Sequence, residues 1–271
     1  MLSSDFSEEL PEIIEPSEST GTAIELEVGG KHSCAYASIR DVKCWGNGSS
    51  GQLGIGNSLL IGDEADEMGE SLPYALLGSQ FEVHQLALSD THTCAVNATG
   101  AVKCWGEIAL LGIGFDDSDG FGDGYIEMGD VLPYLSLPTN LSVDMIEAGG
   151  SHTCAVLDNN DLICWGNNDY GQLGQGNTVD VDDPSGLSAI SLGSNAQSVD
   201  AGVNSVCAVV SNAVKCWGRN TEGQLGLGDT NHRGDGINEM GSNLNSINLA
   251  SGSISQVEVG DGFACGLKSS G

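Results

Sequence analysis

One short pattern recurs along the chain and limits what it can fold into. A Cys-Trp-Gly triplet ends four similar stretches, and another cysteine stands nine or ten residues before the cysteine of each triplet. The four tryptophans lie at positions 45, 105, 165 and 217. Self-similarity at a nearly constant spacing is typical of a repeat array, in which one supersecondary unit is used again and again.

Each repeat is predicted to contain a strand followed by a β-hairpin. Apolar residues alternate with other residues before the first cysteine, as at Leu86 and Leu88, and a period of two is typical of a strand. Between the cysteines the alternation turns back on itself, which places Cys94 opposite Cys104 around a three-residue loop. Gly100 stands where such a loop needs a left-handed residue.

The fourth repeat is one residue shorter and preserves the same pairing. Its loop contains Ser211-Asn212, which fits a two-residue turn. Such a turn keeps Cys207 opposite Cys216, so the deletion preserves the register of the hairpin. Because the shorter loop keeps the register, the two cysteines of each hairpin are expected to be true cross-strand neighbours.

The residues after each tryptophan extend the repeat into a longer motif, with Gly-Gln-Leu-Gly at 51–54, 171–174 and 223–226. The pattern Cys-Trp-Gly-x-Asn-x-x-Gly-Gln-Leu-Gly-x-Gly resembles the repeat of the regulator-of-chromosome-condensation family. The resemblance covers about residues 24–271. It implies an all-β fold, a β-propeller that usually has seven blades, with one four-stranded blade for each repeat.

We therefore expect four complete blade repeats and a partial fifth, as a fragment or open arc of a larger seven-bladed ring. The propeller repeats are predicted within 23–271, with boundaries at 23–80, 81–140, 141–195, 196–252 and a partial 253–271. Residues 1–22 are an acidic segment outside the repeat. This segment lacks the basic and apolar regions of a signal peptide.

The cysteine pairs are candidates for one disulfide in each complete blade. Paired residues on antiparallel strands have Cα separations of about 4.5–5.5 Å, which a disulfide accepts. The predicted pairs are Cys34 with Cys44, Cys94 with Cys104, Cys154 with Cys164 and Cys207 with Cys216, and Cys265 is left unpaired. Two alternatives stay open. The cysteines are reduced and buried in a cytosolic protein, or they bind zinc together with His32, His92 and His152.

Long acidic loops follow the Gly-rich motif and supply candidate ligands for calcium. Asp117, Asp119 and Asp123 resemble part of a calcium-binding loop, although the full ligand pattern is not in register. A solvated acidic surface is the alternative. No other cofactor is expected. Acceptor sequons for N-glycosylation begin at Asn47, Asn97 and Asn140.

The charge of the chain limits its partners. Eight basic residues against 38 acidic ones give a formal net charge of −30, which excludes nucleic acid and favours neutral or basic proteins. No apolar run is long enough for a membrane-spanning helix, so no membrane insertion is expected. No catalytic constellation stands out, and we expect no enzymatic activity.

The sequence therefore predicts a protein–protein interaction or structural module of an extracellular or cell-surface protein. Its expected partners are other proteins and further copies of itself. The family resemblance also implies an alternative, guanine-nucleotide exchange on a small GTPase, which is the activity of the family's founding member. That alternative places the protein in the cytoplasm or nucleus.

Overall fold

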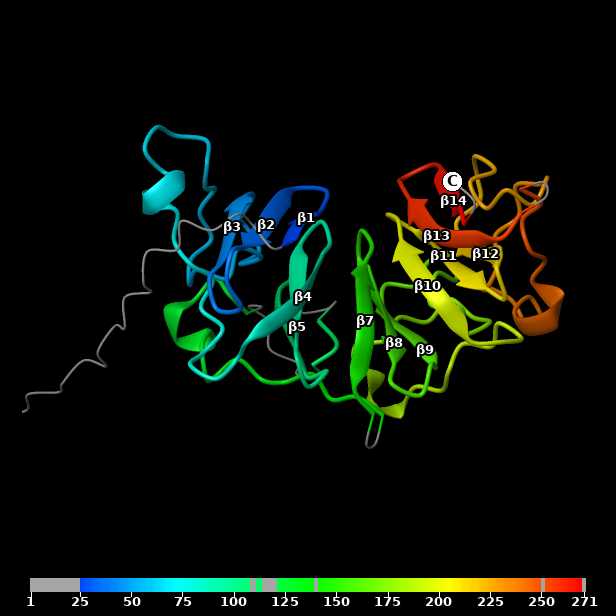
Figure 1. Ribbon diagram of the computed structural model, residues 1–271, viewed down its shortest axis with the longest axis horizontal. Helices are drawn as coiled ribbons and strands as arrows, with labels where there is room; N and C mark the ends of the chain where they lie inside the picture. Colours follow the sequence, from blue (N-terminus) through cyan, green and yellow to red (C-terminus); the bar gives the residue numbers. More distant parts are fainter. Residues whose placement is uncertain (1–24, 108–110, 114–120, 139–140, 250–251, 270–271) are drawn as a thin grey trace, which may run out of the picture.

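The computed structural model describes residues 25–107, 111–113, 121–138, 141–249 and 252–269. The predicted acidic segment 1–22 therefore lies outside the described residues. The strands form five antiparallel sheets that follow one another in chain order around an arc (Figure 1). The predicted all-β, propeller-type arc is confirmed, with each sheet as one blade.

The strands of each blade follow chain order. Blade 1 contains β1 (Glu25–Val28), β2 (His32–Tyr36) and β3 (Val42–Gly46); blade 2 contains β4 (Val83–Leu88), β5 (His92–Asn97) and β6 (Val102–Gly106); blade 3 contains β7 (Val143–Ala148), β8 (His152–Leu157) and β9 (Leu162–Gly166); blade 4 contains β10 (Ala196–Ala201), β11 (Ser205–Val210) and β12 (Ala213–Gly218); blade 5 contains β13 (Ile254–Val259) and β14 (Ala264–Lys268). The described helices are short 3-10 turns at Gly69–Ser71 (η1), Tyr125–Glu127 (η3), Pro184–Gly186 (η4) and Gly241–Asn243 (η5). Within the described residues, no helix is long and apolar enough to cross a membrane.

The hairpins have the predicted register. Cys94 lies opposite Cys104 and Cys207 lies opposite Cys216. Gly100 has a φ of 76°, as its three-residue loop requires. Ser211 and Asn212 have φ values of 52° and 64°, which is the backbone of the two-residue hairpin turn that compensates for the missing residue.

A disulfide closes the hairpin of each of the first four blades. The four bonds join the second strand to the third at Cys34–Cys44, Cys94–Cys104, Cys154–Cys164 and Cys207–Cys216. Their cysteines are buried between neighbouring blades, with an exposed fraction of 1 % or less. Cys265 on β14 is free and exposed.

Among the described residues, each of these four blades has three strands, where the family resemblance implied four. In blade 1 the outer segment meets β3 only at isolated bridges, which join Lys43 to Tyr74 and Gly46 to Ile61. Pro73 precedes the first of these contacts, and proline cannot donate a hydrogen bond to a ladder. The fourth strand implied by the resemblance is therefore reduced to isolated bridges in blade 1.

The blades pack against one another through the tryptophan of the repeated motif. Trp105, Trp165 and Trp217 are fully buried. The indole Nε1 of Trp105 donates to the carbonyl oxygen of Gln52 in blade 1 at 3.0 Å, and that of Trp217 donates to Gln172 in blade 3 at 2.9 Å. The Gly-Gln-Leu-Gly turns of blades 1 and 3 thus bind the tryptophans of blades 2 and 4, whereas the Nε1 of Trp165 in blade 3 has no hydrogen-bond partner.

The last glycine of this turn lets the tryptophan approach. Gly54 has a φ of 69°, and a Cβ atom added there would lie 2.7 Å from Trp105 Nε1. Gly174 repeats the arrangement against Trp217, with a φ of 65° and a distance of 3.1 Å. Any side chain here would combine backbone strain with a clash, so the motif serves the interface between blades.

Blade 1 supplies an internal control for the contribution of this contact, because no described sheet precedes it and Trp45 is only half-buried. Trp105→Ala is expected to lower the free energy of unfolding by about 3–5 kcal/mol, as for other buried tryptophans. Trp45→Ala removes the same atoms from a more open site and is expected to cost less than half as much. Urea unfolding followed by circular dichroism measures both, and equal losses would contradict the interface described here.

Candidate functional site

The first strands of the blades together form the inner wall of the arc. Neighbouring first strands contact each other from β1 through β4, β7 and β10 to β13. These five strands line a cavity of about 590 Å³, and each of them contributes residues to its wall. The cavity lies where the central channel of a propeller is found, so it is the first candidate for a binding site.

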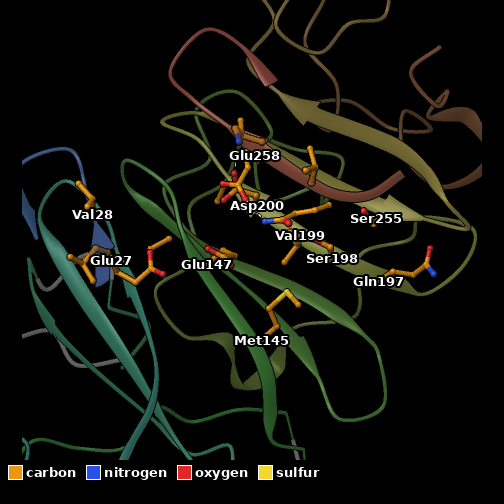
Figure 2. Close-up of a pocket in the computed structure, with 16 residues that line it drawn as sticks. Glu27, Val28, Met145, Glu147, Gln197, Ser198, Val199, Asp200, Ser255 and Glu258 are labelled. Atoms are coloured by element: carbon orange, nitrogen blue, oxygen red, sulfur yellow. Dashed lines mark hydrogen bonds between the residues drawn. The ribbon is translucent and has the colours of Figure 1, made fainter. Parts of the chain in front are cut away.

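Carboxylates occupy one register position around this wall. The position is the one opposite the first cysteine of each hairpin, so the repeat carries it from blade to blade. Four of the five strands have an acidic residue there, and β4 has Ala87. Figure 2 shows the acidic side chains that line the cavity, which are Glu27, Glu147, Asp200 and Glu258.

Burial and mutual repulsion raise the pKa of three of these carboxyl groups, Glu27, Glu147 and Asp200. Burial raises the pKa of Glu147 to about 9, and the charges of Asp200 and Glu27 add to the rise. Burial and the neighbouring Glu25 raise the pKa of Glu27 to about 7. Crowded carboxylates disfavour ionisation of one another, so a cationic group entering the cavity would relieve that cost.

Asp200 also links two blades. Burial raises its pKa to about 6, although the backbone N–H of Val259 opposes the rise by donating a hydrogen bond to the carboxylate. Gln85 makes a similar link from blade 2 to blade 3, since its side chain donates to the Ile146 carbonyl at 3.0 Å and accepts from the Ile146 N–H at 3.2 Å. Polar side chains thus satisfy the exposed edge of the next inner strand.

The three histidines considered for zinc contact hydroxyl groups or apolar surroundings instead of thiolates. His32 Nε2 lies 2.7 Å from Thr93 Oγ1 in the next blade, and His92 Nε2 lies 2.7 Å from Thr153 Oγ1. His152 is fully buried, and neither of its ring nitrogens has a hydrogen-bond partner. Burial lowers the pKa of all three, to about 4, 3 and 4 in chain order.

The structure describes one of the three residues considered for calcium, so the calcium site stays a prediction. Asp117 and Asp119 lie outside the described residues. Asp123 is described, and its side chain is a hydrogen-bond neighbour of Glu127. Over the described ranges, no group of three or more His, Cys, Asp or Glu side chains could hold a metal ion.

Two of the three predicted glycosylation sites are described: Asn47 directly follows β3, and Asn97 is the last residue of β5. The Asn47 side-chain oxygen accepts a hydrogen bond from the Ser49 N–H at 2.8 Å. That of Asn97 accepts from the Thr99 N–H at 3.0 Å. Both asparagines are partly exposed. Asn140 lies outside the described residues, and all three sequons stay predictions.

Three of the acidic loops share a recurring motif that ends in Glu-Met-Gly. Loops 62–69, 122–129 and 234–241 each read Gly-Asp-x-x-x-Glu-Met-Gly. The glutamate folds back onto its own loop, so that Glu67 accepts from the Gly62 N–H at 2.7 Å and Glu239 from the Gly236 N–H at 2.9 Å. These carboxylates replace backbone hydrogen bonds that the turn leaves unmade.

A lysine ties each of these loops to the blade. Lys43, Lys103 and Lys215 donate to the carbonyl of the glycine that follows the methionine, at 2.9, 2.8 and 2.7 Å. Blade 3 lacks the loop motif and has Ile163 at the corresponding position. The lysine and the loop motif therefore occur together, a co-occurrence within the repeats that was visible in the sequence.

Comparison with known proteins identifies the repeat. The model of the Regulator of chromosome condensation (RCC1) repeat matches residues 24–52, 83–107 and 145–172, and a second RCC1 repeat model matches 159–209. The chain is 31 % identical over 210 residues to the ultraviolet-B receptor UVR8 of Arabidopsis thaliana, an alignment that covers 76 % of this chain and 43 % of the receptor. It is 26 % identical to the mitochondrial RCC1 domain-containing protein RUG3 of the same plant, covering 88 % of this chain and 51 % of RUG3.

Two solved structures share the fold. Human WBSCR16 superposes with a TM-score of 0.70 at 22 % identity, covering 93 % of this chain and 59 % of WBSCR16. Yeast RCC1 (Prp20), in its complex with Kap60, superposes with a TM-score of 0.65 at 22 % identity, covering 93 % of this chain and 56 % of Prp20. This chain therefore spans about half the length of the relatives that it matches.

The buried groups of the inner wall predict how stability depends on pH. The raised pKa of Glu147 means that the folded state keeps a proton that the unfolded state loses, so this contribution is lost as the pH rises from about 4.5 through 9. The lowered pKa values of the histidines have the opposite effect on stability. The unfolded state binds protons that the folded state does not, so stability is lost as the pH falls from 6.5 towards 4. We expect maximal stability near pH 6.5, where the histidine contribution is complete, and a decline towards pH 9.

The variant Glu147→Gln isolates the alkaline part of this dependence. Without this carboxyl group, the unfolding free energy should fall less steeply with pH above pH 6.5. The change in slope should correspond to about one bound proton fewer in the folded state. Asp144→Asn makes the same charge change on the exposed side of β7 and should leave the decline as in the wild type. Thermal unfolding between pH 5 and 9 measures all three proteins, and parallel curves for wild type and Glu147→Gln would refute the assignment.

Proposed function

The chain belongs to the regulator of chromosome condensation (RCC1) repeat family, and from this premise we propose that it is a non-enzymatic protein-binding or structural module of an extracellular or cell-surface protein. One observation carries the proposal, which is the disulfide in each of the first four blades. Structural disulfides persist in oxidising compartments and are rare in the cytosol and nucleus. The presence of such a bond in four blades supports the proposal that the protein is exported from the cytosol.

The chemistry of the surface supports a protein partner of basic character. The chain has a formal net charge of −30, and the inner wall places several carboxylates around one cavity. Lysine or arginine side chains of a partner would find favourable charge there, and acidic molecules such as nucleic acids would be repelled. Loops held by a rigid propeller scaffold are a common location for such recognition.

Membrane-impermeant biotinylation of intact cells that make the protein tests the proposed location. The reagent should label the protein without permeabilisation, at the level of a known surface protein and well above a cytosolic control. Labelling that requires permeabilisation would contradict an extracellular or cell-surface module. In a parallel assay, the purified chain should not accelerate GDP release from a Ran-type GTPase; acceleration would favour the exchange-factor alternative.

A further inference from the structure

The outer loop of blade 2 exposes an unusual group of apolar side chains. Tyr125 and Ile126 are 73 % and 82 % exposed, and Val131 and Tyr134 are 68 % and 51 % exposed. We call these four residues the blade-2 rim patch. All four lie in or just after η3, within a short stretch of chain, so they share one part of the rim of the arc. Exposed aromatic and large aliphatic groups gathered in this way mark interaction sites.

The repeats show that the scaffold does not require two of these apolar side chains. Blades 1 and 4 contain the same Gly-Asp-x-x-x-Glu-Met-Gly loop, and alignment on its Met-Gly pair gives the matched positions in each blade. Five of the eight matched residues are polar, and the matched residues are Ala65, Asp66, Ser71 and Tyr74 in blade 1 and Ile237, Asn238, Asn243 and Ser246 in blade 4. Both other blades have polar residues at the positions of Ile126 and Val131. Because the same loop forms without apolar side chains there, Ile126 and Val131 need a reason other than folding.

The loop beneath the patch is anchored on several sides. Glu127 accepts from the Gly124 N–H at 3.0 Å, and the Lys103 ammonium donates to the Gly129 carbonyl at 2.8 Å. Asp130 accepts from the Ser79 N–H at 3.0 Å, which ties the loop to the segment before β4. A pre-organised loop loses little conformational entropy on binding, which favours the patch as a binding surface.

The charge around the patch specifies the partner further. Residues 121–138 include the three acidic residues Asp123, Glu127 and Asp130 and contain no lysine or arginine. The ammonium group beneath them belongs to Lys103, whose side chain is buried and committed to backbone carbonyls. An apolar surface with an acidic border is complementary to apolar side chains flanked by lysine or arginine.

We propose that the blade-2 rim patch is a docking surface for a basic protein segment that carries apolar side chains. The proposal rests on the proposed function, because it assigns to the binding module a contact surface and a partner chemistry. Tyrosines are frequent among residues that dominate interface energies. Tyr125 and Tyr134 would therefore supply the main contacts, with Ile126 and Val131 beside them.

Binding of synthetic peptides to the purified chain tests this assignment. The probe is a labelled peptide of alternating lysine and leucine, and a lysine–serine peptide of equal charge reports binding by charge alone. The variant Tyr125→Ala/Ile126→Asn/Val131→Asn uses residues that blades 1 and 4 already have at the matched positions. Its dissociation constant for the lysine–leucine peptide should rise about tenfold or more.

A matched control comes from blade 4. Ile237→Ala/Asn243→Ser changes two matched positions there and should leave the affinity within about twofold of wild type. Thermal unfolding should give the same midpoint for all three proteins, and the single variant Ile126→Asn replaces the triple variant if the latter is destabilised.

Three results would overturn the proposal, namely equal affinity of wild type and the blade-2 variant, equal binding of the two peptides, or no binding of the lysine–leucine peptide. If both proteins bind this peptide equally and better than lysine–serine, the chain is still a protein-binding module that uses another surface. In that case the proposed function stands while the docking surface is wrong.

Discussion

At two junctions of the arc, the indole of a tryptophan donates to a backbone carbonyl of the preceding blade, and the spacing of those blades depends on that contact. The bond joins Trp105 to Gln52 and Trp217 to Gln172, and glycine at the end of the turn is what brings the two blades close enough. Once the blades are fixed at this spacing, their first strands meet in one register. The carboxylates of the inner wall and the loops of the rim are both placed as a consequence.

The acidic residues of the chain act in two different environments. Glu67, Glu127 and Glu239 accept backbone N–H groups of their own loops and so shape the rim. On the inner wall, burial and the neighbouring carboxylates raise the pKa of Glu147 to about 9. A formal net charge of −30 at pH 7 therefore overstates the ionisation of the folded protein, because part of the inner wall stays protonated there.

The hairpins were predictable because local rules determine them. A period of two, a glycine at the left-handed loop position and cysteines at constant spacing predict which residues pair, and Cys94 does lie opposite Cys104. The inner wall was not predicted, since Glu27 and Glu147 look like ordinary polar residues of amphipathic strands. Only the curvature of the arc turns that side of the strands towards one cavity. The outer fourth strand was expected from the family resemblance, and in blade 1 Pro73 and the inserted loop reduce it to a bridge.

The central claim is that a disulfide closes each of the first four blades, and counting thiols tests it most directly. The protein is denatured without reductant, alkylated and weighed by intact mass spectrometry, and the procedure is repeated after reduction. The account predicts one alkylated thiol before reduction, on Cys265, and nine after it, in agreement with the nine cysteines of the chain. Nine alkylated thiols before reduction, in protein isolated from the cells that make it, would contradict the disulfides and the exported location inferred from them.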